Sequence, residues 1–277
     1  MTKNYGFIIP RITNREEGSE HLLGSLDDEG TIINPRGVWE WLNGEEQRKR
    51  GIETFACTVF ATLRAIETEI KFKTGINIDY SSRYLANIAY KKGILNPQVG
   101  ADPHKIAELI RTIAGCLGND RAPWSDEIKT ADDYYALKDI AELMKEGERW
   151  FDEWELRHRW VWIGNQTPQE KQKLLKIALT KGTVCVSVVA WQQRNGLYYK
   201  EIGERDGHWT GLERYEDELP IVEDSYPESE GDFEKVLESN YDFGIAKVYY
   251  LKKKIKVEET KKNRFINWFR TLKFNFN

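Results

Sequence analysis

Cysteine, histidine and long apolar runs are all scarce in this chain of 277 residues, which contains three cysteines and four histidines. No two cysteines stand at CxxC spacing, so neither a zinc knuckle nor a disulfide framework is predicted, and we expect no metal and no cofactor. No apolar run approaches the roughly 20 residues that cross a bilayer. Residues 1–20 contain too short an apolar run for a secretory signal. These absences favour a chain that stays in a reducing compartment such as the cytoplasm, or is packaged there into something larger.

Charged residues of both signs are abundant, but they are unevenly distributed. The formal net charge is −4, and residues 252–277 contain nine lysines and arginines against two glutamates, so the remaining chain carries −11. An acidic body argues against binding to nucleic acid. In the tail these charges alternate with apolar residues, namely Phe265, Ile266, Trp268, Phe269 and Leu272. Such an amphipathic segment can dock on its own domain or on a partner, and we rank both above contact with a membrane.

Residue spacing divides the chain into a helical half and a β half. Residues 1–45 show no sustained periodicity and are interpreted as an N-terminal arm. Helical spacing with start and stop signals predicts helices at 54–75, 81–93, 103–115, 131–158 and 167–182. β-Branched runs between turn-forming segments predict strands at 183–190, 197–201, 208–213, 219–224 and 244–251. Helices followed by an antiparallel sheet indicate an α+β fold.

Cys57 lies within the first turn of the first strong helix, three residues after Thr54, the expected N-cap. The N-terminus of a helix has unpaired amide hydrogens and a positive partial charge, which favour a thiolate over a thiol. Position alone leaves two interpretations open, a reactive thiol and a small residue that packs a helix end. Cys116, at a helix end, and Cys185, in an apolar strand, are better explained by packing.

The sequence around Cys57 resembles the cysteine-bearing helix of papain-like cysteine peptidases. The stretch is GIETFACTVFATLRAIE, in which Phe60 and Ala61 stand where that family has a phenylalanine and a small residue. Thr58 departs from the usual tryptophan. The motifs are also similar to those of divergent papain-like proteins associated with bacteriophages, which makes a phage virion a candidate location.

The same resemblance extends to the β half of the chain. His208 begins a predicted strand, and sixteen residues later the sequence PIVEDSY contains Asp224 and Tyr226. This segment looks like the family's Asn-Ser-Trp, with Asp224 replacing the asparagine and Tyr226 the tryptophan. A carboxylate would stabilise the imidazolium of His208 more than an amide does, while still accepting the ring N–H bond. The order Cys, His, Asp along the chain agrees with the family.

In the resembled family, a glutamine upstream of the cysteine helps to stabilise the oxyanion. Gln47 is the nearby glutamine before Cys57, and it lies a few residues further away than usual. A short insertion would bring it into place, and Arg50 is an alternative donor. Such a donor matters because its loss typically costs about 3 kcal/mol of transition-state stabilisation.

The resemblance implies a papain-like two-lobed domain over residues 46–251, flanked by the arm and the tail. It implies a peptidase that cleaves protein or peptide substrates through a Cys57–His208–Asp224 triad and a thioester intermediate. One alternative is an inactive papain-like scaffold that acts as a binding or virion structural protein. Another is a peptidoglycan amidase of the Cys-His type. Among the remaining histidines, His104 is a weaker candidate base, and we expect His21 and His158 at the surface.

Overall fold

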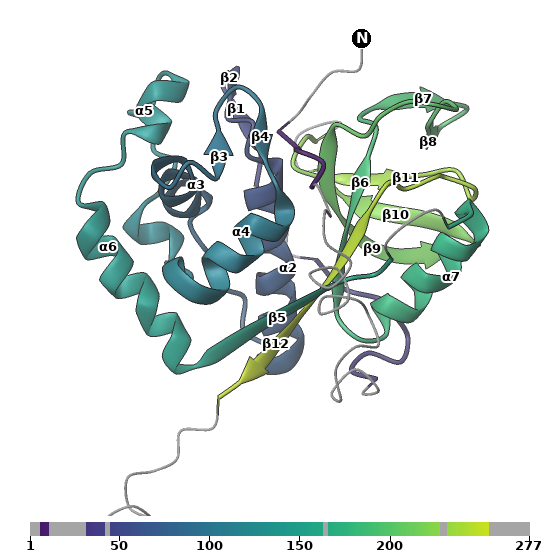
Figure 1. Cartoon of the computed structure of the whole chain (residues 1–277), viewed down its shortest axis with the longest axis horizontal. Helices are drawn as coiled ribbons and strands as arrows, with labels where there is room; N and C mark the ends of the chain where they lie inside the picture. The colour runs from purple at the N-terminus through teal and green to yellow at the C-terminus, as the bar shows by residue number, and fades with distance from the viewer. Residues whose placement is uncertain (1–5, 11–31, 42–44, 163–165, 228–231, 255–277) are drawn as a thin grey trace, which may run out of the picture.

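The structure, a computed structural model, describes residues 6–10, 32–41, 45–162, 166–227 and 232–254. Figure 1 shows two lobes, one made of short helices and the other of a large sheet covered by α7, with α2 between them. The helices are α2 (Cys57–Thr74), α3 (Ser82–Lys91), α4 (Pro103–Leu109), α5 (Ala131–Tyr135), α6 (Ile140–Gly147) and α7 (Pro168–Leu179). Tighter or wider helical turns are η2 (Ile110–Ala114), η3 (Asn119–Arg121) and η4 (Glu148–Asp152). The α+β class and the order of the lobes are as predicted.

The β lobe is built on a six-stranded antiparallel sheet in the order β11-β10-β9-β6-β12-β5. Its strands are β5 (Trp154–Trp160), β6 (Thr183–Val188), β9 (His208–Glu216), β10 (Leu219–Glu223), β11 (Glu234–Val236) and β12 (Ala246–Lys253). All six residues of β6 are buried, as the β-branched sequence predicts. The long strands β5 and β12 run from this sheet toward the helical lobe (Figure 1) and so join the two halves.

Helix α2 contacts α3 and α4 in the helical lobe as well as β6 and β9 in the sheet. Because α2 has neighbours in both lobes, most of its residues are buried. The helix ends at Gly75, whose φ of 72° is left-handed and whose N–H donates to Lys71 O. The predicted N-cap is wrong. Ala56 is the N-cap, and the Thr54 hydroxyl instead donates to the Gln47 carbonyl oxygen at 3.1 Å.

Among the described residues, three short hairpins accompany the large sheet. They are β1 (Arg48–Lys49) with β2 (Ile52–Glu53), β3 (Leu95–Asn96) with β4 (Gly100–Ala101), and β7 (Gln192–Arg194) with β8 (Leu197–Tyr199). A piece of the N-terminal arm pairs with β4, because Ile8 N–H donates to Ala101 O and Ala101 N–H donates to Gly6 O, both at 3.0 Å. These backbone hydrogen bonds therefore attach the arm to the helical lobe.

One predicted helix is partly wrong. The range 131–158 contains α5, α6 and η4, but its end belongs to β5. In the sequence WELRHRW, large side chains recur at every second residue, which is the period of a strand rather than of a helix. Pairing with β12 along the whole length of β5 stabilises this conformation. By contrast, the predicted capping box of Thr167 and Glu170 at the start of α7 is confirmed.

None of the helices within the described ranges is long and apolar enough to cross a membrane. The docking segment predicted in the C-terminal tail falls almost entirely on residues 255–277, which lie outside the described residues. His21 also lies outside them. The domain boundaries at 45 and 251 stay predictions.

Candidate active site

Cys57 is the first residue of α2 and has no solvent exposure. Burial raises the pKa of its thiol well above the usual value, and the charges of Asp224 and Glu53 raise it further. Backbone hydrogen bonds from Trp209 and Thr58 act in the opposite direction. The sulfur therefore lies beside the first turn of α2 and beside the residue that follows His208. The net environment favours the neutral thiol in this state of the protein.

His208 and Asp224 meet at neighbouring tips of the sheet. His208 is the first residue of β9, Asp224 directly follows β10, and these strands pair. The His208 Nε2 atom hydrogen-bonds to Asp224 Oδ1, and both side chains are fully buried. Burial alone would raise the pKa of Asp224, but the charge and the hydrogen bond of His208 lower it. The ring is thus held in one orientation by a carboxylate that stays ionised.

Aromatic rings enclose the imidazole. The Tyr226 ring lies 5.3 Å from the His208 ring in a tilted arrangement, and the Trp191 ring lies 5.8 Å away edge-on. Lys235, which is buried, places its Nζ atom 3.6 Å from Asp224 Oδ2 and 5.3 Å from the centre of the Trp191 ring. Tyr226, which the sequence comparison placed at the family's tryptophan, thus packs against the imidazole. Sequence reasoning missed Trp191 and Lys235, because nothing in their spacing connects them to His208.

Gln47 lies against the segment that contains Asp224. Its backbone N–H donates to Ser225 O at 3.0 Å, and its side-chain Oε1 accepts from Ser225 Oγ at 2.9 Å. Its Nε2 atom donates to Glu53 Oε1 at 2.8 Å and to the Tyr226 hydroxyl at 2.6 Å. The tight hairpin of β1 and β2 follows Gln47 directly and lies between it and Cys57 in the sequence. Sequence reasoning missed Glu53.

The N-terminal arm approaches the same region. Phe7 is buried and stacks on the Trp209 ring, with 5.5 Å between ring centres and planes 8° apart. Gly6 packs so tightly on Phe55 that a Cβ at this position would come 2.3 Å from the Phe55 carbonyl oxygen. The arm therefore lies beside Phe55, two residues before Cys57, and beside Trp209, which directly follows His208.

The other histidines that the structure describes form a separate cluster. His158 is buried on β5, where its Nε2 atom pairs with Glu108 Oε1 at 2.8 Å, so its predicted surface position is wrong. Its alternation with Trp160 and Leu156 on one face of β5 explains the burial. His104 lies half-buried on α4, and its Nδ1 atom is 3.3 Å from Lys247 Nζ. The described residues also contain no group of three or more His, Cys, Asp or Glu side chains suited to a metal.

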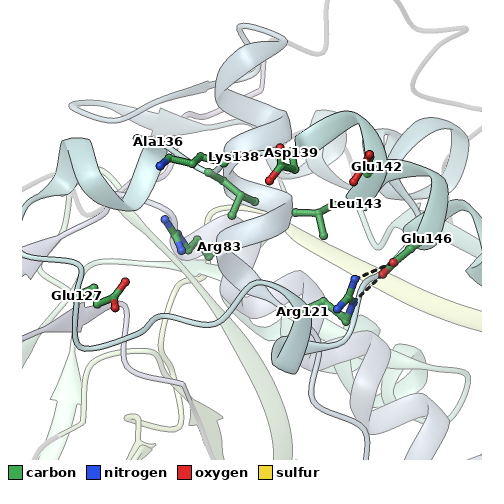
Figure 2. A pocket seen from close by; sticks show the side chains of 10 residues that line it. Arg83, Arg121, Glu127, Ala136, Lys138, Asp139, Glu142, Leu143 and Glu146 are labelled. Atoms are coloured by element: carbon green, nitrogen blue, oxygen red, sulfur yellow. Dashed lines mark hydrogen bonds and ion pairs between the residues drawn. The ribbon is translucent and has the colours of Figure 1, made fainter.

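A pocket of about 490 Å³ lies in the helical lobe. Figure 2 shows the side chains that line it, and none of the predicted site residues is among them. Its two arginines are already engaged. Arg121 pairs with Glu146 through two bonds of 2.8 Å, and Arg83 donates to the backbone carbonyls of Tyr134, Asp133 and Pro123. The pocket lining contains no cysteine or histidine, so this pocket does not provide the thiol and imidazole of the predicted site.

No protein-family model and no curated protein sequence matches the chain. Solved structures do match. Xylellain, a cysteine protease from Xylella fastidiosa, has a TM-score of 0.59 at 16% identity, covering 91% of this chain and 96% of that one. The proform of the ragweed pollen cysteine protease Amb a 11 has a TM-score of 0.55 at 13% identity, covering 82% and 70%. Digestive procathepsin L 3 of Tenebrio molitor larval midgut has a TM-score of 0.50 at 14% identity, covering 79% and 74%. The chain thus has the papain-like cysteine protease fold.

Proposed function

We propose that the chain is a cysteine peptidase in which Cys57 is the nucleophile, His208 the acid–base group and Asp224 the group that orients the imidazole. One observation carries the proposal: the His208–Asp224 hydrogen bond forms at the strand tip next to Trp209, whose backbone hydrogen-bonds to Cys57. A thiol, an imidazole and a carboxylate in this order are the groups that peptide hydrolysis through a thioester requires.

In the proposed reaction, Cys57 transfers its proton to His208 and its sulfur attacks the peptide carbonyl carbon. The tetrahedral intermediate collapses, the C–N bond breaks, and His208 gives the proton to the leaving amine. Water, deprotonated by His208, then attacks the thioester and releases the carboxylic acid and the thiol. Substrate has to favour the ionised pair, because the resting environment raises the pKa of the Cys57 thiol.

Gln47 and the Cys57 backbone N–H are the proposed oxyanion donors. The Cys57 N–H belongs to the first turn of α2 and has no partner within the helix ladder. Gln47 is held by Ser225 beside the His208–Asp224 pair. Arg50, the alternative donor, is exposed at the hairpin turn and pairs with Asp126, so Gln47 is the better supported of the two.

The test compares Cys57→Ala with Cys185→Ala, a buried cysteine on β6 whose sulfur donates to Ala61 O. Cleavage of peptide substrates and labelling by a thiol-directed covalent inhibitor should both disappear in Cys57→Ala and persist in Cys185→Ala. Equal cleavage by the wild type and Cys57→Ala would exclude Cys57 as the nucleophile.

A second candidate function is an inactive scaffold that binds a partner or forms part of a virion. It is favoured because Cys57 is completely buried and because nearby carboxylates raise the pKa of its thiol. A folded wild-type protein whose Cys57 reacts with no active-site-directed reagent at any pH between 5 and 9 would favour this candidate over the peptidase.

A further inference from the structure

Gln47, Glu53 and Tyr226 form a closed set of hydrogen bonds. Gln47 Nε2 donates to Glu53 Oε1 at 2.8 Å and to the Tyr226 hydroxyl at 2.6 Å, and this hydroxyl donates to Glu53 Oε2 at 2.6 Å. A side-chain amide nitrogen has two hydrogens. Each of them therefore has an acceptor within the protein.

The orientation of this set is fixed at both ends. The carboxylate of Glu53 can only accept, so the end of the Gln47 amide that faces it is the nitrogen, and Ser225 Oγ donates to Gln47 Oε1 at the other end. The backbone N–H of Phe55, two residues before Cys57, donates to Glu53 Oε1 at 2.9 Å and so holds the Glu53 carboxylate in place. Hydrogen bonds to a carboxylate are stronger than those between neutral groups, so Glu53 holds the Tyr226 hydroxyl firmly beside Gln47.

We propose that Tyr226 restrains its own active site: its hydroxyl oxygen accepts the Gln47 hydrogen that the oxyanion of a substrate would accept, and Glu53 holds it there. This inference rests on the proposed function, in which Gln47 is an oxyanion donor. Tyr226 and Glu53 are positioning residues, because they act through Gln47. A substrate carbonyl has to displace the hydroxyl from Gln47 before the tetrahedral intermediate gains that bond.

Tyr226→Phe separates the two contributions of this side chain. It removes the hydroxyl but keeps the ring that packs on His208. In Tyr226→Phe, Gln47 no longer bonds to the tyrosine hydroxyl and can donate to the oxyanion. We therefore expect kcat/KM of this variant to be about fivefold higher than that of the wild type, the change expected for one net neutral hydrogen bond. The gain should vanish in a Gln47→Ala background, because the two changes act on the same bond.

The experiment measures kcat/KM on fluorogenic peptides for the wild type, Tyr226→Phe, Gln47→Ala and the double variant. Tyr215→Phe is the matched control, because its hydroxyl also bonds to a glutamine, Gln172, away from the site. It should behave as the wild type. Tyr226→Trp is a second variant without a hydroxyl, and its indole N–H cannot accept a hydrogen bond. Circular dichroism and thermal unfolding establish that each variant is folded.

Two results would overturn the inference while the wild type cleaves peptides. The first is that folded Tyr226→Phe and Tyr226→Trp are no faster than the wild type. The second is an equal gain in the Gln47→Ala background. If the wild type and every variant fail to cleave and Cys57 remains unlabelled, the proposed function fails, and the inference fails with it. The behaviour of the wild type therefore distinguishes the two failures.

Discussion

The imidazole of His208 hydrogen-bonds through Nε2 to the carboxylate of Asp224; both side chains are buried, and the rings of Trp191 and Tyr226 pack against the imidazole. The buried, ionised carboxylate of Asp224 is stabilised by further partners besides His208. Ser225 N–H donates to the same oxygen at 2.7 Å, and Lys235 lies 3.6 Å from the other. These partners explain why the pKa of Asp224 is lowered although its burial opposes this.

The first prediction concerns the acceptor itself. Asp224→Ala should lower kcat/KM by about 100-fold or more, because the imidazole loses the group that orients it for proton transfer. Asp224→Asn should lose less, since an amide oxygen can still accept the ring N–H. Peptide cleavage by the two variants, with inhibitor labelling to count competent sites, provides the measurement. Equal losses in both would mean that the charge, rather than the orientation, is what matters.

The residues predicted from the sequence differ in how they were found. Cys57 could be singled out because helix periodicity begins next to it, whereas the link from His208 to Asp224 came from resemblance to a family. The structure brings these last two into contact, and their roles stay proposals. Periodicity also located α2, β6 and β10, whose burial depends on local residue patterns.

What the sequence could not predict depends on contacts between distant segments. Glu53, Trp191 and Lys235 reach the site from three separate segments, namely β2, the turn before β7 and β11, and each is an ordinary residue type in an ordinary local pattern. The predicted Thr54 cap is absent because α2 begins later, with Ala56 at its N-cap, and the Thr54 hydroxyl donates to the carbonyl oxygen of Gln47, brought back by a two-residue hairpin turn. Tertiary partners therefore decided these positions, and local propensity did not.

The second prediction concerns the charge of Glu53. After burial and the charge of Asp224, this carboxylate raises the pKa of the Cys57 thiol. Glu53→Gln removes that charge, so the thiolate should form at lower pH than in the wild type. The rate of alkylation of Cys57 as a function of pH, followed by peptide mass mapping, provides the measurement. Glu218→Gln, in the exposed turn between β9 and β10, is the control. An unchanged or higher midpoint in Glu53→Gln would contradict the assigned electrostatic effect.

The third prediction concerns the arm. Phe7→Ala removes the ring stacked on Trp209, so bulky thiol reagents should reach Cys57 faster. The free energy of unfolding should fall by about 3 kcal/mol, as for a buried phenylalanine truncated to alanine. Ile9→Ala is the matched control, because Ile9 is 51% exposed in the same segment. The same labelling rate in both variants would show that Phe7 does not limit access to the thiol.

The fourth prediction begins from Lys247, a fully buried lysine on β12 outside the proposed site. Its Nζ atom lies 3.7 Å from the centre of the Trp160 ring and 3.3 Å from His104 Nδ1. Burial lowers its pKa to about 7, and the charge of Arg159 also lowers it, while Asp102 and Glu108 on the α4 side raise it. On β5, the neighbouring His158 has a pKa lowered by burial and by Lys247 itself.

In the unfolded chain a lysine titrates near pH 10.4, well above the folded value. Between the two pKa values the unfolded state binds a proton that the folded state does not, so the contribution of Lys247 to the free energy of unfolding rises with pH. Lys247→Met should flatten this rise between pH 7 and 10. At pH 6 it should stabilise the protein by up to ~4 kcal/mol, less whatever the cation–π contact with Trp160 contributes. Urea denaturation at pH 6, 8 and 10 measures the difference, with the exposed Lys252→Met as the control. If the difference in the free energy of unfolding between the wild type and Lys247→Met is the same at all three pH values, Lys247 keeps an ordinary pKa in the folded protein.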